Sequence, residues 1–367
     1  MGIEGQITGI KYDILLADTL KQVSLNKFNI NKTPAYFILK DRNNSYAMSK
    51  WVSPKRTRSY PYERVYNTLN SPKKITIIPI IKDEGVDGDR DYLQWDNISL
   101  MSLLDVFVIF GYYDEAIKNQ RYKNKITDFK FNNKYILSKI KEIKQYHSSA
   151  LHWNLNELNT NFSRIVEKVQ KSYAKIETQT GVILHNQLGI DKFLQKIRND
   201  VSVFMDFSRE KAEKAQSREI STVQPKEKLS TATKEKLTIV NYLGGQYFFT
   251  VDEICFYNNT LLLTESKHTK HSLLPSKGDI KDGLLKMILY SNLTNVKING
   301  IKTQSKGVLS LTSSLLQGQL ISNHKIHERV KFFLQNNLSP EISVFIDTLF
   351  KEADTNNFIL KIGQLND

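Results

Sequence analysis

The stretch that decides the fold reads YFFTVDEICFYNNTLLLTESK and occupies residues 247–267. It contains two apolar runs, residues 251–257 and 260–263, joined by Asn258-Asn259. Asparagine tolerates the positive φ of a tight turn, so this pattern predicts a β-hairpin. The preceding run, residues 247–250, is expected to form a further strand.

Three polar side chains gather at the open end of this hairpin. Counting back from the turn puts Asp252 roughly opposite Glu265. Because side chains alternate along a strand, Glu265 and Lys267 project from one face and Ser266 points away. The apolar run at residues 261–263 indicates a strand buried on both faces, and charges at the end of such a strand indicate a functional site.

Phosphodiester hydrolysis needs groups of this kind. Asp252, Glu265 and the backbone carbonyl of Ser266 would supply the hard oxygen ligands that Mg²⁺ prefers. Such an ion polarises a phosphate and lowers the pKa of a water molecule, while Lys267 orients the water and stabilises the developing charge. We therefore expect Asp252, Glu265 and Lys267 to be catalytic, and Asp252, Glu265 and Ser266 to hold the metal.

Two alternatives remain open for this motif. Glu-x-Lys tripeptides arise by chance, and a surface ion pair at the hairpin end would need no catalytic role. Glu253 is a second candidate for the role of Asp252, although alternation directs it to the opposite face.

The motif resembles that of the PD-(D/E)xK nuclease superfamily, particularly its type II restriction endonucleases. In that family a helix is followed by a three-stranded antiparallel meander, a second helix and a strand. The aspartate lies on the second strand and (D/E)xK on the third. The resemblance maps these positions to Asp252, Glu265 and Lys267, the second helix to residues 279–290 and the last strand to residues 295–298.

The resemblance covers residues 237–302, and Val251 stands where the family often has proline. It implies an α/β fold with a restriction-endonuclease-like core, a mixed sheet flanked by helices. It also implies Mg²⁺-dependent, sequence-specific cleavage of double-stranded DNA by a homodimer, because two-fold symmetry suits a palindromic site. The alternatives are a repair or recombination nuclease with the same core and a non-catalytic basic DNA-binding protein.

The charge of the chain agrees with a polyanionic partner. Its 52 Lys and Arg residues exceed its 38 Asp and Glu residues, which gives a formal net charge of +14. Basic residues that bind phosphates release condensed counterions, although a generally basic composition gives the same excess. The expected DNA-binding residues lie in a basic and aromatic segment and directly after the catalytic motif: Lys55, Arg56, Arg58, Arg64, His268 and Lys270. Each group could equally be a solvated loop.

Patterning divides the chain into three regions. Residues 1–130 form a β-rich N-terminal lobe, in which Pro79 limits one strand to an edge or a bulge. Residues 131–236 are a helical region, with apolar faces at 136–143 and 151–176, followed by a linker within 209–236. Residues 237–367 contain the nuclease core and C-terminal helices.

Several further features narrow the class of protein. The single cysteine, Cys255, excludes an internal disulfide, and the most apolar stretch, residues 98–113, is too short to span a bilayer. With no signal peptide at the N-terminus, we expect a soluble cytoplasmic protein. The acidic cluster at residues 83–91 partly matches a calcium loop, but Tyr92 and Ile98 replace the glycine and the closing glutamate. A structured loop is therefore the preferred interpretation of the cluster.

Overall fold

A computed structural model of the chain contains two compact units. Unit 1 comprises Met1–Asp18 and Ala212–Asp367, and unit 2 comprises Thr19–Lys211. The linker expected within 209–236 and the Gly244-Gly245 turn lie almost wholly outside the described residues. The structure describes residues 2–42, 44–56, 58–186, 188–191, 193, 204, 206, 208, 210, 214, 234–241 and 246–364.

These units divide the chain elsewhere than at residues 130 and 236. The N-terminal strand β1 (Gly2–Ile7) pairs with β11 (Glu235–Asn241) and β15 (Thr294–Ile298), so the first residues belong to the C-terminal unit. The helices after residue 131 pack on strands of unit 2. Contacts between distant segments, which local patterning does not reveal, therefore set the units.

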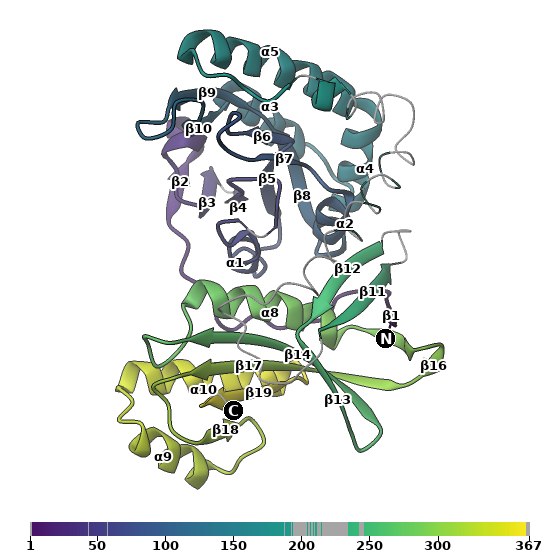
Figure 1. The fold of residues 1–367 in the computed structure, drawn as a ribbon, viewed down its shortest axis with the longest axis vertical. Coiled ribbons are helices and arrows are strands. Elements are labelled where there is room, and N and C mark those ends of the chain that lie inside the picture. Colours follow the sequence, from purple (N-terminus) through teal and green to yellow (C-terminus); the bar gives the residue numbers. More distant parts are fainter. Residues whose placement is uncertain are drawn as a thin grey trace. The chain divides into compact units, whose positions relative to one another are not determined.

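Unit 2 is built on a mixed five-stranded sheet in the order β2-β3-β4-β5-β8 (Figure 1). The neighbouring strands β4, β5 and β8 run parallel. Two short antiparallel pairs accompany this sheet, β6 with β7 and β9 with β10. The strands are β2 (Gln22–Ser24), β3 (Tyr36–Asp41), β4 (Asn44–Lys50), β5 (Lys74–Pro79), β6 (Ile81–Asp83), β7 (Arg90–Tyr92), β8 (Val106–Gly111), β9 (Tyr113–Lys118) and β10 (Ile126–Phe131).

The expected position of Pro79 at a sheet edge or a bulge is wrong. β5 lies between β4 and β8 in the sheet, and Pro79 is its last residue, paired with Gly111. At the end of a strand, proline leaves the rest of the hydrogen-bond ladder intact.

The helices of unit 2 bury the two apolar stripes identified in the sequence. Ile136, Ile140 and Ile143 are buried on α3, which confirms that helix. The second stripe is confirmed but divides at Asn161 between α4 and α5. The helices are α1 (Pro61–Tyr66), α2 (Trp95–Leu103), α3 (Asn133–Lys144), α4 (Ala150–Thr160) and α5 (Phe162–Thr180), with 3₁₀ turns η1 (Leu25–Lys27) and η2 (Ile30–Lys32).

Side chains of α4 satisfy the open edge of β8. The Asn154 amide accepts a hydrogen bond from Val108 N at 2.7 Å and donates one to Val106 O at 3.0 Å. The Trp153 indole donates to Val108 O at 2.9 Å. These bonds replace the missing neighbouring strand at this end of the sheet.

Unit 1 contains two five-stranded sheets, β12-β11-β1-β15-β16 and β13-β14-β17-β19-β18. Helix α8 (Lys277–Ser291) follows the hairpin and runs along β14 and β17 (Figure 1). The remaining elements are β12 (Gln246–Val251), β13 (Glu253–Tyr257), β14 (Thr260–Thr269), β16 (Ile301–Lys302), β17 (Gln304–Ser313), β18 (Gln319–Ile321), α9 (Ile326–Gln335), α10 (Pro340–Thr355) and β19 (Ile359–Gly363).

The hairpin predicted at residues 251–267 is confirmed. β13 and β14 are antiparallel, and Asn258 and Asn259 have φ values of 46° and 60°. Two successive positive φ angles are the geometry of a type I′ turn. β14 is buried along most of its length, as its apolar run indicated.

One strand assignment beside the hairpin is wrong. Residues 295–298 do form a strand, β15, but it pairs with β1 and not with β14. The strand that follows α8 beside β14 is β17, which is parallel to it over ten residue pairs from Thr260↔Gln304 to Thr269↔Ser313. Among the helices of the described ranges, none combines the length and apolar surface that crossing a membrane requires.

The edge of β8 gives a first testable prediction. Asn154→Leu keeps the volume of the side chain but leaves Val108 N and Val106 O buried without partners. We expect it to lower the free energy of unfolding by about 2–4 kcal/mol. Urea denaturation followed by tryptophan fluorescence measures this, because all three tryptophans, Trp51, Trp95 and Trp153, lie in unit 2.

The matched control is Asn159→Ala on the same helix, where the side chain is exposed. It should change the free energy of unfolding by no more than about 0.5 kcal/mol. An Asn154→Leu protein as stable as the wild type would show that the amide does not support the strand edge.

Candidate functional site

Asp252 lies where one extended strand changes partners. Only this residue separates β12, which pairs with β11, from β13, which pairs with β14. Its backbone N donates to Thr264 O at 3.1 Å, and its side-chain Oδ2 accepts a hydrogen bond from Ser266 N at 2.8 Å. The register extends to place Asp252 opposite Glu265, as the sequence predicted. Asp252 is therefore buried and fixed against the Glu265-Ser266-Lys267 triplet.

Glu265 is the centre of a buried ion-pair cluster. Lys267 Nζ lies 2.9 Å from Glu265 Oε1 and 3.2 Å from Asp282 Oδ2. Lys286 Nζ lies 2.6 Å from Glu265 Oε2. The Glu265 side chain is only 2% exposed, so these attractions are weakly screened by water.

The charges of this cluster hold one another ionised. Burial alone raises the pKa of Glu265, but Lys267 and Lys286 lower it to about 2. Burial likewise lowers the pKa of Lys267, whereas Glu265 and Asp282 raise it above the ordinary lysine value. At neutral pH the site therefore contains a carboxylate and an ammonium group.

Asp282 and Lys286 on α8 were not among the residues predicted from the sequence. They are four residues apart and so lie on one face of the helix. A Cβ on Gly283 would lie 2.7 Å from Leu309 Cδ1, 3.7 Å from Lys267 Cε and 3.8 Å from Glu265 Cγ. A side chain at this position would push against the end of the Leu309 side chain, so glycine eases the close approach of α8. An isolated glycine inside an apolar helix is the sequence feature that could have indicated close packing on this face.

The Tyr290 hydroxyl adds a polar group beside these charges. It is buried and has no hydrogen-bond partner within the described residues. Burial raises the pKa of Tyr290, and Lys286, Glu265 and Asp252 are all close enough to influence it. A buried hydroxyl without a partner suits a site that receives water or a ligand.

The possible metal ligands are all oxygen atoms. N–H and C=O of one strand residue point to the same side, so the Ser266 carbonyl faces the side from which its N–H reaches Asp252. In the part of the chain that the structure describes, no three His, Cys, Asp or Glu side chains form a metal-binding group. A metal at this site would rely on two carboxylates and this carbonyl.

The four expected DNA-binding residues of unit 2 have different environments. Lys55 is exposed and Arg56 is partly buried. Arg64 is partly buried and donates to the backbone carbonyl of Lys50. Arg58 forms ion pairs with Glu84, Asp89 and Asp91. Lys55 is therefore the most accessible of the four, and the guanidinium of Arg58 is engaged within the unit.

The two expected DNA-binding residues after the motif also differ. His268 is only 7% exposed, and its Nδ1 lies 2.9 Å from Thr312 Oγ1. Lys270 is exposed. Of this pair, only Lys270 presents its side chain to solvent.

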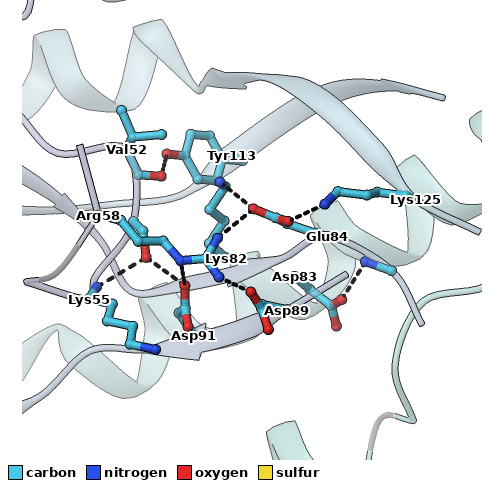
Figure 2. Close-up of polar contacts among 12 residues, drawn as sticks. Val52, Lys55, Arg58, Lys82, Asp83, Glu84, Asp89, Asp91, Tyr113 and Lys125 are labelled. Atoms are coloured by element: carbon cyan, nitrogen blue, oxygen red, sulfur yellow. Dashed lines mark hydrogen bonds and ion pairs between the residues drawn. The ribbon is translucent and has the colours of Figure 1, made fainter. Parts of the chain in front are cut away.

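The acidic cluster at residues 83–91 forms the β6–β7 hairpin and its ion pairs (Figure 2). Glu84 lies between Lys82 and Lys125, at 2.7 and 3.1 Å. Burial raises the pKa of Glu84, but these two lysines lower it to about 2. The other carboxylates also have partners: Asp83 with His185, Asp87 with Asn124 N, Asp89 with Arg58, and Asp91 with Arg58 and Ser53. These contacts favour the structured loop over a calcium site.

The ion pairs of Glu265 predict a pH-dependent stability. Glu265→Gln removes the buried carboxylate that two partly buried ammonium groups share, so we expect unit 1 to lose about 3–5 kcal/mol at pH 7. The folded pKa of about 2 is below the unfolded value of roughly 4.3. This stabilisation is therefore complete above the unfolded pKa and is lost as pH falls through the folded one. The difference from wild type should shrink below about pH 4.

Urea unfolding followed by circular dichroism measures this change. The unfolding midpoint seen by tryptophan fluorescence, which reports on unit 2 alone, should be unchanged. Glu253→Gln in the same hairpin is the control and should shift stability by no more than about 0.5 kcal/mol. A difference between Glu265→Gln and wild type that stays constant from pH 7 to pH 3 would contradict the assignment.

Comparisons of this chain with protein-family models, with curated proteins and with solved structures gave no match.

Proposed function

We propose that the chain is a metal-dependent DNA endonuclease whose catalytic residues are Asp252, Glu265 and Lys267. The observation that carries the proposal is the hydrogen bond from Ser266 N to Asp252 Oδ2. It fixes an aspartate from one strand beside the glutamate and lysine of the next. Two carboxylates and an ammonium group at one buried point are the groups that phosphodiester hydrolysis uses.

The donor set fits Mg²⁺, since Asp252, Glu265 and the Ser266 carbonyl are hard oxygen ligands. Both oxygens of Glu265 are engaged by lysines, so metal binding would require one ammonium to move away from it. Lys286 is the natural choice, because Asp282 anchors Lys267 at the site. The Tyr290 hydroxyl, which has no partner within the described residues, leaves a polar contact for the incoming group.

Each residue would have a distinct role in the reaction. Mg²⁺ bound by the carboxylates would supply charge that polarises the scissile phosphodiester and acidifies water. Lys267 keeps its proton, because its neighbours raise its pKa. It therefore stabilises negative charge on the phosphate as a cation and does not remove a proton as a base.

The order of elements supports the more specific proposal of a restriction-endonuclease-like core. β11, the β12–β13 strand and β14 are successive antiparallel neighbours. α8 follows them, and after β15 and β16 the chain returns as β17, which runs parallel to β14. Asp252 falls on the middle strand and Glu265 and Lys267 on the third, as in the resemblance. We propose a type II enzyme that cleaves double-stranded DNA at a specific sequence as a homodimer.

A repair or recombination nuclease would use the same core. A methyltransferase gene beside this one would favour restriction. A non-catalytic DNA-binding protein is the alternative of a different class, since the Glu265 cluster also stabilises unit 1. The net charge of +14 supports a DNA partner in all three cases.

Cleavage of plasmid DNA tests the catalytic proposal. We expect nicked and linear products with Mg²⁺ or Mn²⁺ and none with EDTA. Asp252→Asn, which keeps the side-chain shape but removes the charge, should reduce the cleavage rate by at least about 100-fold. Folding, followed by circular dichroism, should be unchanged.

Glu253→Gln is the matched control, because it removes the adjacent carboxylate, and it should cleave at the wild-type rate. Wild-type activity in Asp252→Asn, or cleavage that persists in EDTA, would overturn the proposed site. Binding of DNA without cleavage under any metal would favour the non-catalytic alternative.

The exposure of the basic residues predicts which of them bind phosphate. Lys55→Ala and Lys270→Ala should each weaken binding to all duplexes similarly. Each should also make the slope of log K against log salt concentration shallower by about one unit. Arg58→Ala should mainly destabilise unit 2, because it leaves Glu84 and Asp91 with fewer cations. If Arg56 or Arg64 reads a base, its alanine variant should lose about 1–3 kcal/mol of binding free energy on the cognate site and none on random DNA.

Fluorescence anisotropy with cognate and random duplexes at two salt concentrations separates these outcomes. Lys351→Ala, at an exposed lysine of α10, controls for the loss of one positive charge. Unchanged affinity and unchanged salt dependence in both lysine variants would remove them from the DNA interface.

A further inference from the structure

Unit 2 contains a cavity of about 590 Å³ that the nuclease proposal does not use. Its lining includes Lys50, the last residue of β4, Lys82 on β6, three residues after β5 ends, and Tyr113, two residues after β8 ends. β4, β5 and β8 are the three neighbouring parallel strands of the sheet, so the cavity lies beyond their carboxyl ends. That is where open α/β sheets bind ligands, and the volume is within the range of small-molecule sites.

Positive charge dominates one part of the lining. Lys82 and Lys125 both pair with Glu84, and in the described ranges neither has another carboxylate partner (Figure 2). Lys50 Nζ donates to the backbone carbonyls of Ile30 and Thr33, both at 2.7 Å, and has no carboxylate partner among the described residues. The ammonium groups therefore exceed the carboxylates that neutralise them.

Arg64 brings unused donors to the same cavity. One of its terminal nitrogens donates to Lys50 O, and its other N–H groups have no partner in the part of the chain that is described. A guanidinium group offers paired donors with the geometry of phosphate oxygens or of a base edge.

Aromatic rings form the other part of the lining. Tyr113 stacks on Phe131 with centroids 4.5 Å apart, and Phe129 lies against Tyr113 at 5.0 Å. The Tyr113 hydroxyl donates to Val52 O and so holds its ring in place (Figure 2). Trp51 also lines the cavity, and its buried indole N–H has no acceptor within the described residues.

The two parts of the lining together select the ligand. A purely apolar ligand would leave the cations without compensation, and inorganic phosphate would leave most of the volume empty. A planar base joined to a phosphate suits both parts, because bases stack on aromatic rings and phosphates bind Lys and Arg. We propose that this cavity of unit 2 binds a single nucleotide.

Two sources could supply this nucleotide: a free nucleotide in solution or a nucleotide turned out of a DNA strand. The cavity lies wholly within unit 2, so the proposal holds or fails independently of cleavage at Asp252. If the nucleotide comes from a DNA strand, the inference rests on the proposed function and assigns the reading of a base to unit 2.

Calorimetric titration of the full chain tests binding. The probes are the four deoxynucleoside monophosphates, the matching nucleosides and inorganic phosphate. At least one nucleotide should bind with a stoichiometry of one and more tightly than its nucleoside or phosphate. Phe129→Leu, which keeps apolar volume but removes the ring, and Lys125→Gln should each weaken binding by about tenfold.

Lys123→Gln is the control, since this exposed lysine lies on the same β9–β10 hairpin but does not line the cavity. It should bind as the wild type does. A duplex carrying 2-aminopurine is the DNA arm, and a fluorescence increase that Phe129→Leu abolishes would assign the nucleotide to DNA. The proposal is overturned if both arms are negative, or if Phe129→Leu and Lys125→Gln bind like the wild type.

Discussion

The burial of Glu265 is the constraint on which the rest of the proposed active site depends. A carboxylate so deep in unit 1 remains charged only because Lys267 and Lys286 surround it. Lys286 comes from α8, so the helix must lie close against β14, and Gly283 faces Lys267 and Glu265 on that strand. The same packing brings Tyr290 to the cluster. Removing the carboxylate would thus disturb the helix, the strand and the site together.

The hairpin and the helices could be predicted from the sequence because local patterns determine them. Asn258-Asn259 specified the turn, and alternation along β14 put Glu265 and Lys267 on one face. The opposition of Asp252 and Glu265 followed from counting residues across that turn. The catalytic roles of these residues, the metal and the DNA partner stay predictions, since the structure bears on their positions alone.

Non-local pairing explains what the sequence did not reveal. β15 was expected beside the hairpin, yet its neighbour is β1, about 290 residues earlier in the chain. Pro79 indicated an edge, but β5 lies between two strands, and it tolerates the proline because the proline is its last residue. Lys286 and Asp282 were missed since an ordinary i, i+4 pair gives no sign of the strand it faces. Arg58 was expected to bind DNA, because the sequence does not show that it pairs with three acidic residues of the β6–β7 hairpin.

The proposed function requires Asp252 and Glu265 to hold a divalent metal jointly. The most direct measurement is anomalous diffraction from crystals of the full chain soaked in Mn²⁺. The account predicts one peak within about 2.0–2.2 Å of carboxylate oxygens from both residues, with Lys286 displaced from Glu265. A Mn²⁺ peak elsewhere in the chain, or a Glu265 that keeps both lysines with no peak beside it, would contradict the account.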